Sequence, residues 1–282
     1  MTGRNYLKTA LLLAGLSGLL LLIGSRFGSA GVTIALVAAV VMNGIAYFYS
    51  DKIAIRAAGA VPVSEAEFPE LHRIVRGLAD RAGIPMPRLY VSPSPQPNAF
   101  ATGRNPENAV VAVTQGILPI LDSRELEGVL AHELSHVQNR DILISSVAAT
   151  IGAVITWLAY LAYFIPSSDD DDGNPFAGLL MVVLAPLAAG LIQMAISRSR
   201  EFGADSSGAR LTADPMALAS ALRKIEAYAR GTPPATANPS TAHLFIANPF
   251  KGGAGVANLF STHPSTAERV ERLERMAYGP HA

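Results

Sequence analysis

A short run near the middle of the chain carries residues that could bind a metal ion. Residues 132–136 read His-Glu-Leu-Ser-His. On a helix, His132 and His136 would stand one turn apart on the same side, so that each could direct a ring nitrogen at one ion. Glu133 is displaced by one position and would face the attacking water, where a general base is needed. The pattern predicts a metal-dependent hydrolase.

A catalytic zinc site also needs a third protein ligand and an open position. Position 142 is Ile, which excludes the longer form of the motif with a third histidine. The remaining candidates are Asp141, Glu201, Asp205 and His263. Glu201 is the strongest, because Asp205 follows it by four positions on the same helical face and could accept the outer N–H of a ligand histidine. The alternative is that both are an ordinary charged helix end.

Four uncharged, largely apolar stretches surround these residues: 9–25, 27–50, 142–168 and 173–197. About 20 residues at ~1.5 Å each cross a hydrocarbon core, and none of these stretches has the charged face of a soluble helix. The chain is 50% hydrophobic and only 16% charged, and we therefore predict four transmembrane helices. A cleaved signal peptide is the alternative for the first stretch.

The basic residues predict how the spans are oriented. Most of those that flank the spans lie before the first and third or after the second and fourth: Arg4, Lys8, Lys52, Arg56, Arg140, Arg198 and Arg200. Both termini, and the region between the second and third spans, should therefore be cytosolic.

Charge and cysteine content narrow the function further. The chain has 22 basic and 22 acidic residues, which gives no electrostatic reason to expect nucleic acid as a partner. It has no cysteine, so a metal must be held by His, Asp or Glu.

Periodicity predicts the elements that must position the site. Apolar residues at helical spacing predict a helix over about 65–82, and two short β-branched runs predict strands at 88–92 and 108–113. Asp122 with Glu125 predicts a capping box for the helix that carries His132. Three further helices are expected: one over 200–210, one over 215–230 with Asp214 as its cap, and a final one with Pro264 in its first turn. A long loop is expected over 231–262.

Four motifs taken together resemble a known family. They are His132–His136 with Asn139 and Asp141, residues 197–205 (SRSREFGAD), residues 98–103 (NAFATG) and residues 261–264 (STHP). They resemble the HtpX family of bacterial membrane zinc proteases, which are relatives of the CAAX prenyl proteases. The resemblance covers nearly the whole chain and implies an α+β, mainly α-helical fold: a gluzincin-like metalloprotease domain with a small β-sheet, plus four transmembrane helices.

The resemblance also implies roles for single residues. One zinc ion per chain would be held by His132, His136 and Glu201, with Glu133 as the base. Asp205 and Asn139 would orient the ligands, and His263 or Arg269 would stabilise the developing oxyanion. Before Pro264, His263 could equally be only a residue at a helix start. A strand edge would bind an extended substrate through Asn98, Ala99, Phe100 and Ala101, although a plain hairpin edge is the alternative.

These expectations divide the chain into four regions: a transmembrane hairpin (1–50), a first cytosolic part of the protease domain (51–141), a second transmembrane hairpin with an acidic loop (142–197) and a second cytosolic part (198–282). The resemblance implies a zinc endopeptidase of the bacterial inner membrane that hydrolyses misfolded or damaged membrane proteins, and unfolded polypeptides, on the cytosolic side of the lipid bilayer. The alternatives are a narrow-specificity peptidase for lipidated or prenylated tails and a non-catalytic membrane zinc-binding scaffold. The oligomeric state does not follow from the sequence.

Overall fold

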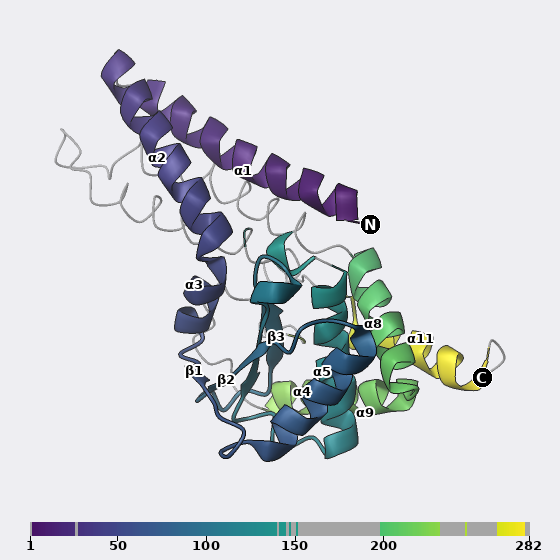
Figure 1. Ribbon diagram of the computed structural model, residues 1–282. Coiled ribbons are helices and arrows are strands. Elements are labelled where there is room, and N and C mark those ends of the chain that lie inside the picture. Colours follow the sequence, from purple (N-terminus) through teal and green to yellow (C-terminus); the bar gives the residue numbers. More distant parts are fainter. Residues whose placement is uncertain are drawn as a thin grey trace, which may run out of the picture.

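The computed structural model of the chain describes residues 2–25, 28–139, 141–144, 147, 151, 198–231, 246 and 264–279. These residues form mostly helices and one four-stranded sheet. Figure 1 shows two parts, a long helical hairpin and a rounded body that contains the sheet and the remaining helices. The predicted α+β, mainly helical class is confirmed for these residues.

The N-terminal hairpin consists of α1 (Thr2–Ser25) and α2 (Gly28–Phe48), which lie side by side (Figure 1). The Asn43 amide donates a hydrogen bond to the Ser17 hydroxyl across the pair (2.8 Å). Among the described helices, α2 is the one long and apolar enough to cross a membrane, with 21 residues and a mean hydropathy of 2.0. The apolar part of α1 is shorter, Leu7–Leu22. Most of the third predicted span and all of the fourth lie outside the described residues.

The described start of the third predicted span packs against this hairpin. Its buried residues are Leu143, Ile144, Val147 and Ile151. They share one apolar cluster with Leu12, Leu16 and Leu20 of α1 and with Ala39 of α2. Because these residues come soon after the end of α5 (Ser123–Gln138), the chain runs from that helix directly to the hairpin.

The sheet has the strand order β1-β2-β4-β3. β1 (Val61–Pro62) and β3 (Ala99–Thr102) are antiparallel to their neighbours, whereas β2 (Arg88–Ser92) and β4 (Val110–Thr114) are parallel. The prediction of a strand at 88–92 is confirmed. The strand predicted at 108–113 begins later, because residues Pro106–Asn108 form a 3-10 turn (η1) whose N-cap is Asn105. Among the described strands, β3 lies at one edge of the sheet.

Helices cover both faces of the sheet. One face packs against α4 (Pro69–Ala82) and α5, and the other packs against α3 (Ser50–Ala57). α4 starts at Pro69 rather than at 65 because Pro occupies its first turn, and it ends at Gly83, whose φ of 65° is left-handed. The predicted capping box of α5 is confirmed, since Asp122 accepts from Glu125 N–H (2.9 Å) and Glu125 accepts from Asp122 N–H (3.0 Å).

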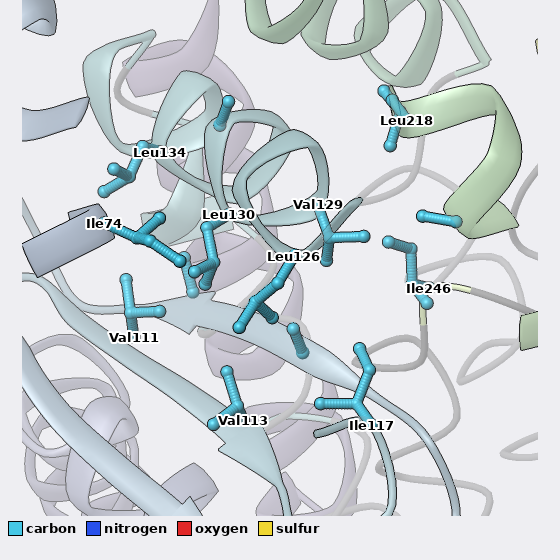
Figure 2. Close-up of a cluster of buried hydrophobic side chains, with 14 of the residues drawn as sticks. Ile74, Val111, Val113, Ile117, Leu126, Val129, Leu130, Leu134, Leu218 and Ile246 are labelled. Atoms are coloured by element: carbon cyan, nitrogen blue, oxygen red, sulfur yellow. The ribbon is translucent and has the colours of Figure 1, made fainter. Parts of the chain in front are cut away.

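Three C-terminal helices complete the body: α8 (Arg198–Thr212), α9 (Pro215–Gly231) and α11 (Thr266–Tyr278). The predicted cap of α9 is confirmed, because Asp214 accepts a hydrogen bond from Ala217 N–H (3.1 Å). Pro264 was predicted to lie in the first turn of α11, and this is wrong. Ser265 is the N-cap of that helix and forms a capping box with Glu268, so Pro264 precedes the helix. Figure 2 shows how side chains of the sheet, α5 and α9 meet in the main core, for example Val111, Leu130 and Leu218.

Two glycines allow α5 to approach its neighbours closely. A Cβ on Gly208 of α8 would lie 2.8 Å from the backbone N of His132, and a Cβ on Gly128 of α5 would lie 2.8 Å from the backbone N of Leu218. No side chain fits at either distance. The closeness at Gly208 sets where α8 can place its other side chains relative to His132.

We predict that Gly208→Ala destabilises the protein by about 1–3 kcal/mol and weakens binding of the zinc ion expected from the motifs, because the added methyl group must push α8 away from α5. Melting temperature in detergent and zinc content at equilibrium measure both effects. Gly203→Ala is the matched control on the same helix: a Cβ there meets nothing within 4 Å. It should leave zinc content unchanged and raise stability slightly, since Ala favours helix. Equal behaviour of the two variants would contradict the packing argument.

Candidate metal centre

The two histidines of the HELSH motif lie one turn apart near the end of α5. His132 is buried and His136 is half-buried. Their rings meet edge to face, with centroids 4.8 Å apart and an interplanar angle of 89°. The two Nε2 atoms are 3.3 Å apart. Both rings therefore direct the same nitrogen at one point.

The third member of the cluster comes from the first turn of α8. The Glu201 carboxylate lies 3.6 Å from Nε2 of His132 through one oxygen and 3.6 Å from Nε2 of His136 through the other. The side chain is buried. Among the described residues, His132, His136 and Glu201 form the group of potential metal ligands whose donor atoms all lie within 4.8 Å of one another.

The spacing of these atoms fits a tetrahedral zinc ion. Bonds of about 2.0–2.1 Å at tetrahedral angles separate two ligand atoms by roughly 3.3–3.4 Å. The Nε2–Nε2 distance of 3.3 Å lies in that range, and each Nε2 lies 3.6 Å from a different oxygen of Glu201, close to it. Two imidazoles and one carboxylate are also a donor set that suits zinc.

Each imidazole is oriented by a carboxylate on its outer nitrogen. His132 Nδ1 lies 2.9 Å from Asp205, and His136 Nδ1 lies 3.1 Å from Asp141. An Nδ1–H that donates to a carboxylate leaves the Nε2 lone pair free for a metal. The placement of Asp205 is the one expected from its spacing to Glu201. The pairing of Asp141 with His136 was missed, because Asp141 was considered only as a ligand; its position just past the end of the helix was the available signal.

Arg269 of α11 lies behind His132 instead of facing the metal side. It is 1% exposed, and its Nε and one terminal nitrogen donate to the two oxygens of Asp205 at 2.9 and 2.7 Å. The other terminal nitrogen donates to the carbonyl of Ile246 (3.2 Å). Arg269 was predicted to stabilise the oxyanion. Its placement does not fit that role, because its N–H groups bind Asp205 and Ile246 on the Nδ1 side of the His132 ring.

Charge in this cluster shifts the pKa of several groups. Burial alone would raise the pKa of Asp205, but Arg269 and His132 hold it well below its usual range. Burial opposes the charged form of His136, yet the Asp141 carboxylate more than offsets this and raises its pKa to about 10. The pKa of His132 is also raised, because Asp205 and Glu201 outweigh burial and Arg269.

Glu133 is a buried side chain next to the cluster of potential metal ligands. It is buried, and burial raises its pKa above the usual range of a glutamate. One carboxylate oxygen accepts a hydrogen bond from Ala101 N–H in β3 (3.0 Å). A glutamate that holds protons more readily than usual suits general acid–base chemistry near neutral pH. The hydrogen bond also fixes the edge strand against the helix.

The register of β3 shows which of its residues face outward. Thr114 N–H donates to the Asn98 carbonyl (2.9 Å), and hydrogen-bonded pairs alternate along an antiparallel ladder. The main-chain groups of Ala99 and Ala101 therefore point away from β4. The hydrogen bond of Ala101 to Glu133 lies on that side. The predicted edge is thus placed beside the metal cluster.

Other predicted residues have different placements. Phe100 pairs with Ala112 through its main chain and packs its ring against the cluster under α3, with Ile55, so it does not fit contact with a substrate. Asn98 binds the N–H of Ile246 through its side-chain oxygen (3.0 Å). Asn139 is the C-cap of α5, with its N–H donating to Ser135 O (2.9 Å). His263 lies outside the described residues.

Comparisons with known proteins agree with this geometry. The sequence pattern of peptidase family M48 matches residues 65–277. A "Protease HtpX homolog" of Paraburkholderia phytofirmans is 54% identical over 278 residues, which are 97% of each chain. A protein of the same name from Ralstonia pickettii is 53% identical over the same shares. The crystal structure of S. mikatae Ste24p is similar, with a TM-score of 0.54 and 19% identity, over 96% of this chain and 66% of that chain. At this identity the similarity supports the fold alone. The resemblance drawn from the motifs is confirmed.

We predict that Asp141→Asn weakens zinc binding by about 10- to 100-fold, because the carboxylate that orients His136 loses its charge. Competition with a chelator in detergent measures the affinity. Asp80→Asn removes an exposed carboxylate on α4 and is the matched control. Equal zinc affinity of the two variants would show that Asp141 does not support the ligand.

Zinc affinity should also rise with pH. The Asp141 carboxylate raises the pKa of His136 to about 10, and Asp205 and Glu201 raise the pKa of His132, so a zinc ion must compete with protons for the two rings. Protons thus compete with zinc below these pKa values, and affinity is lost as the pH falls. Titrations from about pH 6 to about pH 8, referenced to a chelator of known pH dependence, should show tightening over the whole range. An affinity that does not change with pH would contradict this.

Proposed function

Because the chain belongs to peptidase family M48 and is therefore a metallopeptidase, we propose that it is a zinc endopeptidase built into the bacterial inner membrane. Its substrates would be misfolded or damaged membrane proteins and unfolded polypeptides, cut on the cytosolic side as part of quality control. The observation that carries the proposal is the convergence of His132, His136 and Glu201, with Glu133 beside them.

The proposed ligands are the three residues of that cluster. Zinc, when bound, would supply Lewis-acid chemistry that activates water and polarises the scissile carbonyl. Glu133 would take the proton of the attacking water on its carboxylate and deliver it to the nitrogen of the departing amine. Asp205 and Asp141 would keep each imidazole in the tautomer that presents Nε2. Arg269 would act through Asp205 as a positioning residue.

Three protein ligands favour catalysis over a structural metal site. A closed structural zinc site has four protein ligands, whereas a catalytic one keeps a position for solvent or substrate. The candidate group has three members among the described residues. The buried Glu133, held next to the group by Ala101, is a further feature that a scaffold protein would not need.

The edge of β3 that faces away from β4 is the proposed binding surface for the substrate backbone. The main-chain groups of Ala99 and the carbonyl of Ala101 could pair with an extended peptide, whereas the Ala101 N–H already donates to Glu133. Hydrogen bonds to the backbone do not depend on the side chains of the peptide, which suits a protease of broad specificity. Asn98 would hold the peptide at one end of the edge.

The membrane part of the proposal rests on the N-terminal hairpin and on the chain after α5. α2 could span a bilayer, and Leu143 and Ile144 are buried against the hairpin shortly after His136. The metal site would therefore lie near the membrane surface. We keep the division into two hairpins, residues 1–50 and 142–197, and two cytosolic parts, with both termini cytosolic.

We predict that Glu133→Gln retains zinc but loses cleavage by roughly 10²- to 10⁴-fold, because the base is removed and the ligands are intact. Glu201→Gln should lose zinc itself. Glu127→Gln, a partly exposed glutamate on the same helix, is the control and should behave like the native protein. Zinc content and cleavage of an unfolded protein substrate are measured in detergent.

If the native protein binds zinc but shows no cleavage that depends on Glu133, the alternative of a non-catalytic zinc-binding scaffold would be favoured. If product mapping on membrane-protein substrates found cuts confined to lipidated tails, the broad substrate class would be wrong while the peptidase activity would stand.

A further inference from the structure

Three aromatic residues in a row lie at the end of α2. Tyr47 and Phe48 meet edge to face, with ring centroids 4.9 Å apart, and Tyr49 follows them. Phe48 is 55% exposed and Tyr49 is 50% exposed. Aromatic side chains are enriched where a transmembrane helix passes from the hydrocarbon into the headgroup layer. These rings therefore mark the level at which α2, as a membrane span, would leave the hydrocarbon.

Two cations lie over these rings. The ammonium nitrogen of Lys52, in α3, is 4.8 Å from the centroid of the Tyr49 ring. The guanidinium carbon of Arg104, in the loop after β3, is 5.5 Å from the centroid of the Phe48 ring. A cation at such a distance is attracted by the face of the ring. Because residues 52 and 104 are far apart in the sequence, it is the fold that brings both charges to the same end of α2.

Within the described part of the chain, neither cation forms an ion pair with an acidic side chain. Asp51 is next to Lys52, but it is bound by Arg88 (3.0 Å). The exposed Arg76 and Arg81 of α4, by contrast, each pair with a glutamate. The two positive charges at the end of α2 can therefore bind an anion from outside the chain.

The loop that carries Arg104 is short and fixed. Gly103 has a φ of 135°, and a Cβ there would lie 2.6 Å from the backbone O of Asn108. On the other side of Arg104, Asn105 caps η1 by accepting from Asn108 N–H (3.1 Å). A binding group that is already held in place loses little conformational entropy when a ligand binds.

We propose that Lys52 and Arg104 together bind the phosphate of an anionic phospholipid headgroup at the point where α2 leaves the bilayer. Basic residues directly after a membrane span attract anionic lipids. The rings of Phe48 and Tyr49 would supply apolar contact just below the phosphate. The inference rests on the proposed membrane location of the chain and adds to it the class of lipid that is bound.

The headgroup would also fix the depth of the proposed substrate edge. Ala101 lies three residues before Arg104, which is about 10 Å at about 3.3 Å per residue. The N–H of Ala101 binds Glu133, and Phe100 next to it packs under α3 with Ile55. Figure 1 shows α3 running from the end of α2 to the side of the sheet. A lipid bound at Arg104 would thus hold this edge close to the headgroup layer, where a membrane protein presents its cytosolic segments.

Native mass spectrometry of the full chain in neutral detergent tests the site, because it counts bound phosphatidylglycerol and bound phosphatidylcholine. The native chain should bind the anionic lipid several-fold more tightly. Lys52→Gln and Arg104→Gln should each weaken its affinity for phosphatidylglycerol by about fivefold, since one cation at a membrane surface contributes about that factor. Arg104→Lys keeps the charge and should retain most of the affinity. Lys52→Gln, at an exposed position, keeps the test decisive if Arg104→Gln fails to fold.

Arg56→Gln is the matched control. Arg56 is an exposed cation in the last turn of α3, one turn beyond Lys52 and about 6 Å further from the aromatic rings along the helix. The variant removes the same charge and should change the affinity for phosphatidylglycerol by less than about twofold, because that charge lies further from the lipid surface. Equal weakening by Arg56→Gln and Lys52→Gln would show a general attraction to positive charge and would overturn the site.

Glycerol 3-phosphate distinguishes a lipid from a soluble phosphate ester. It carries a phosphate without acyl chains, so at equal concentration it should leave phosphatidylglycerol bound. Full displacement of the lipid would show that the two cations bind soluble phosphate esters, and the assignment to a lipid would be wrong.

The outcomes also separate the site from the proposed function. If the native protein shows Glu133-dependent cleavage but binds both lipids equally, the headgroup site is overturned while the peptidase stands. If the chain expressed in bacteria is absent from the membrane fraction, the proposed membrane location is wrong, and the headgroup site is overturned with it.

Discussion

The buried carboxylate of Asp205 joins His132 to Arg269, and the rest of the site depends on these contacts. It accepts from the outer nitrogen of His132 and from two nitrogens of Arg269, and all three side chains are almost fully buried. A charge in the interior is very costly unless it is paired and hydrogen-bonded, so each member of the group needs the others. Since His132 belongs to α5, Asp205 to α8 and Arg269 to α11, the group fixes three helices to one another and orients a metal ligand at the same time.

The same arrangement makes the metal site a product of tertiary structure. Glu201 reaches the two histidines only if α8 packs on α5 at the distance that Gly208 allows. The chain between these helices carries the third and fourth predicted spans, and its described start packs on the N-terminal hairpin. Folding of the proposed membrane part and assembly of the ligand set are therefore linked, and a bound metal ion would stabilise both because it binds only the folded state.

Local sequence patterns were enough to predict the elements that are determined by residues close together in the chain. The HELSH spacing, the Asp122–Glu125 capping box and the strand at 88–92 depend on residues close together in the chain, and the structure contains them. Glu201 and Asp205 were identified because both lie on one helical face. Three features depend on contacts between distant residues and could not be read in this way: the position of Arg269 behind Asp205, the packing of Phe100 under α3, and the binding of Ile246 by Asn98. Pro264 was misjudged because Ser265, with Glu268, made a better cap one residue later.

X-ray absorption at the zinc edge, measured on the full, zinc-loaded chain, identifies the ligands of the ion. We predict a four-coordinate ion with two imidazole nitrogens at about 2.0–2.1 Å, a carboxylate oxygen, and one light ligand that exchanges with solvent. Glu201→Gln should retain too little zinc to give this spectrum. A site closed by four protein ligands, or a spectrum without paired imidazoles, would contradict the account.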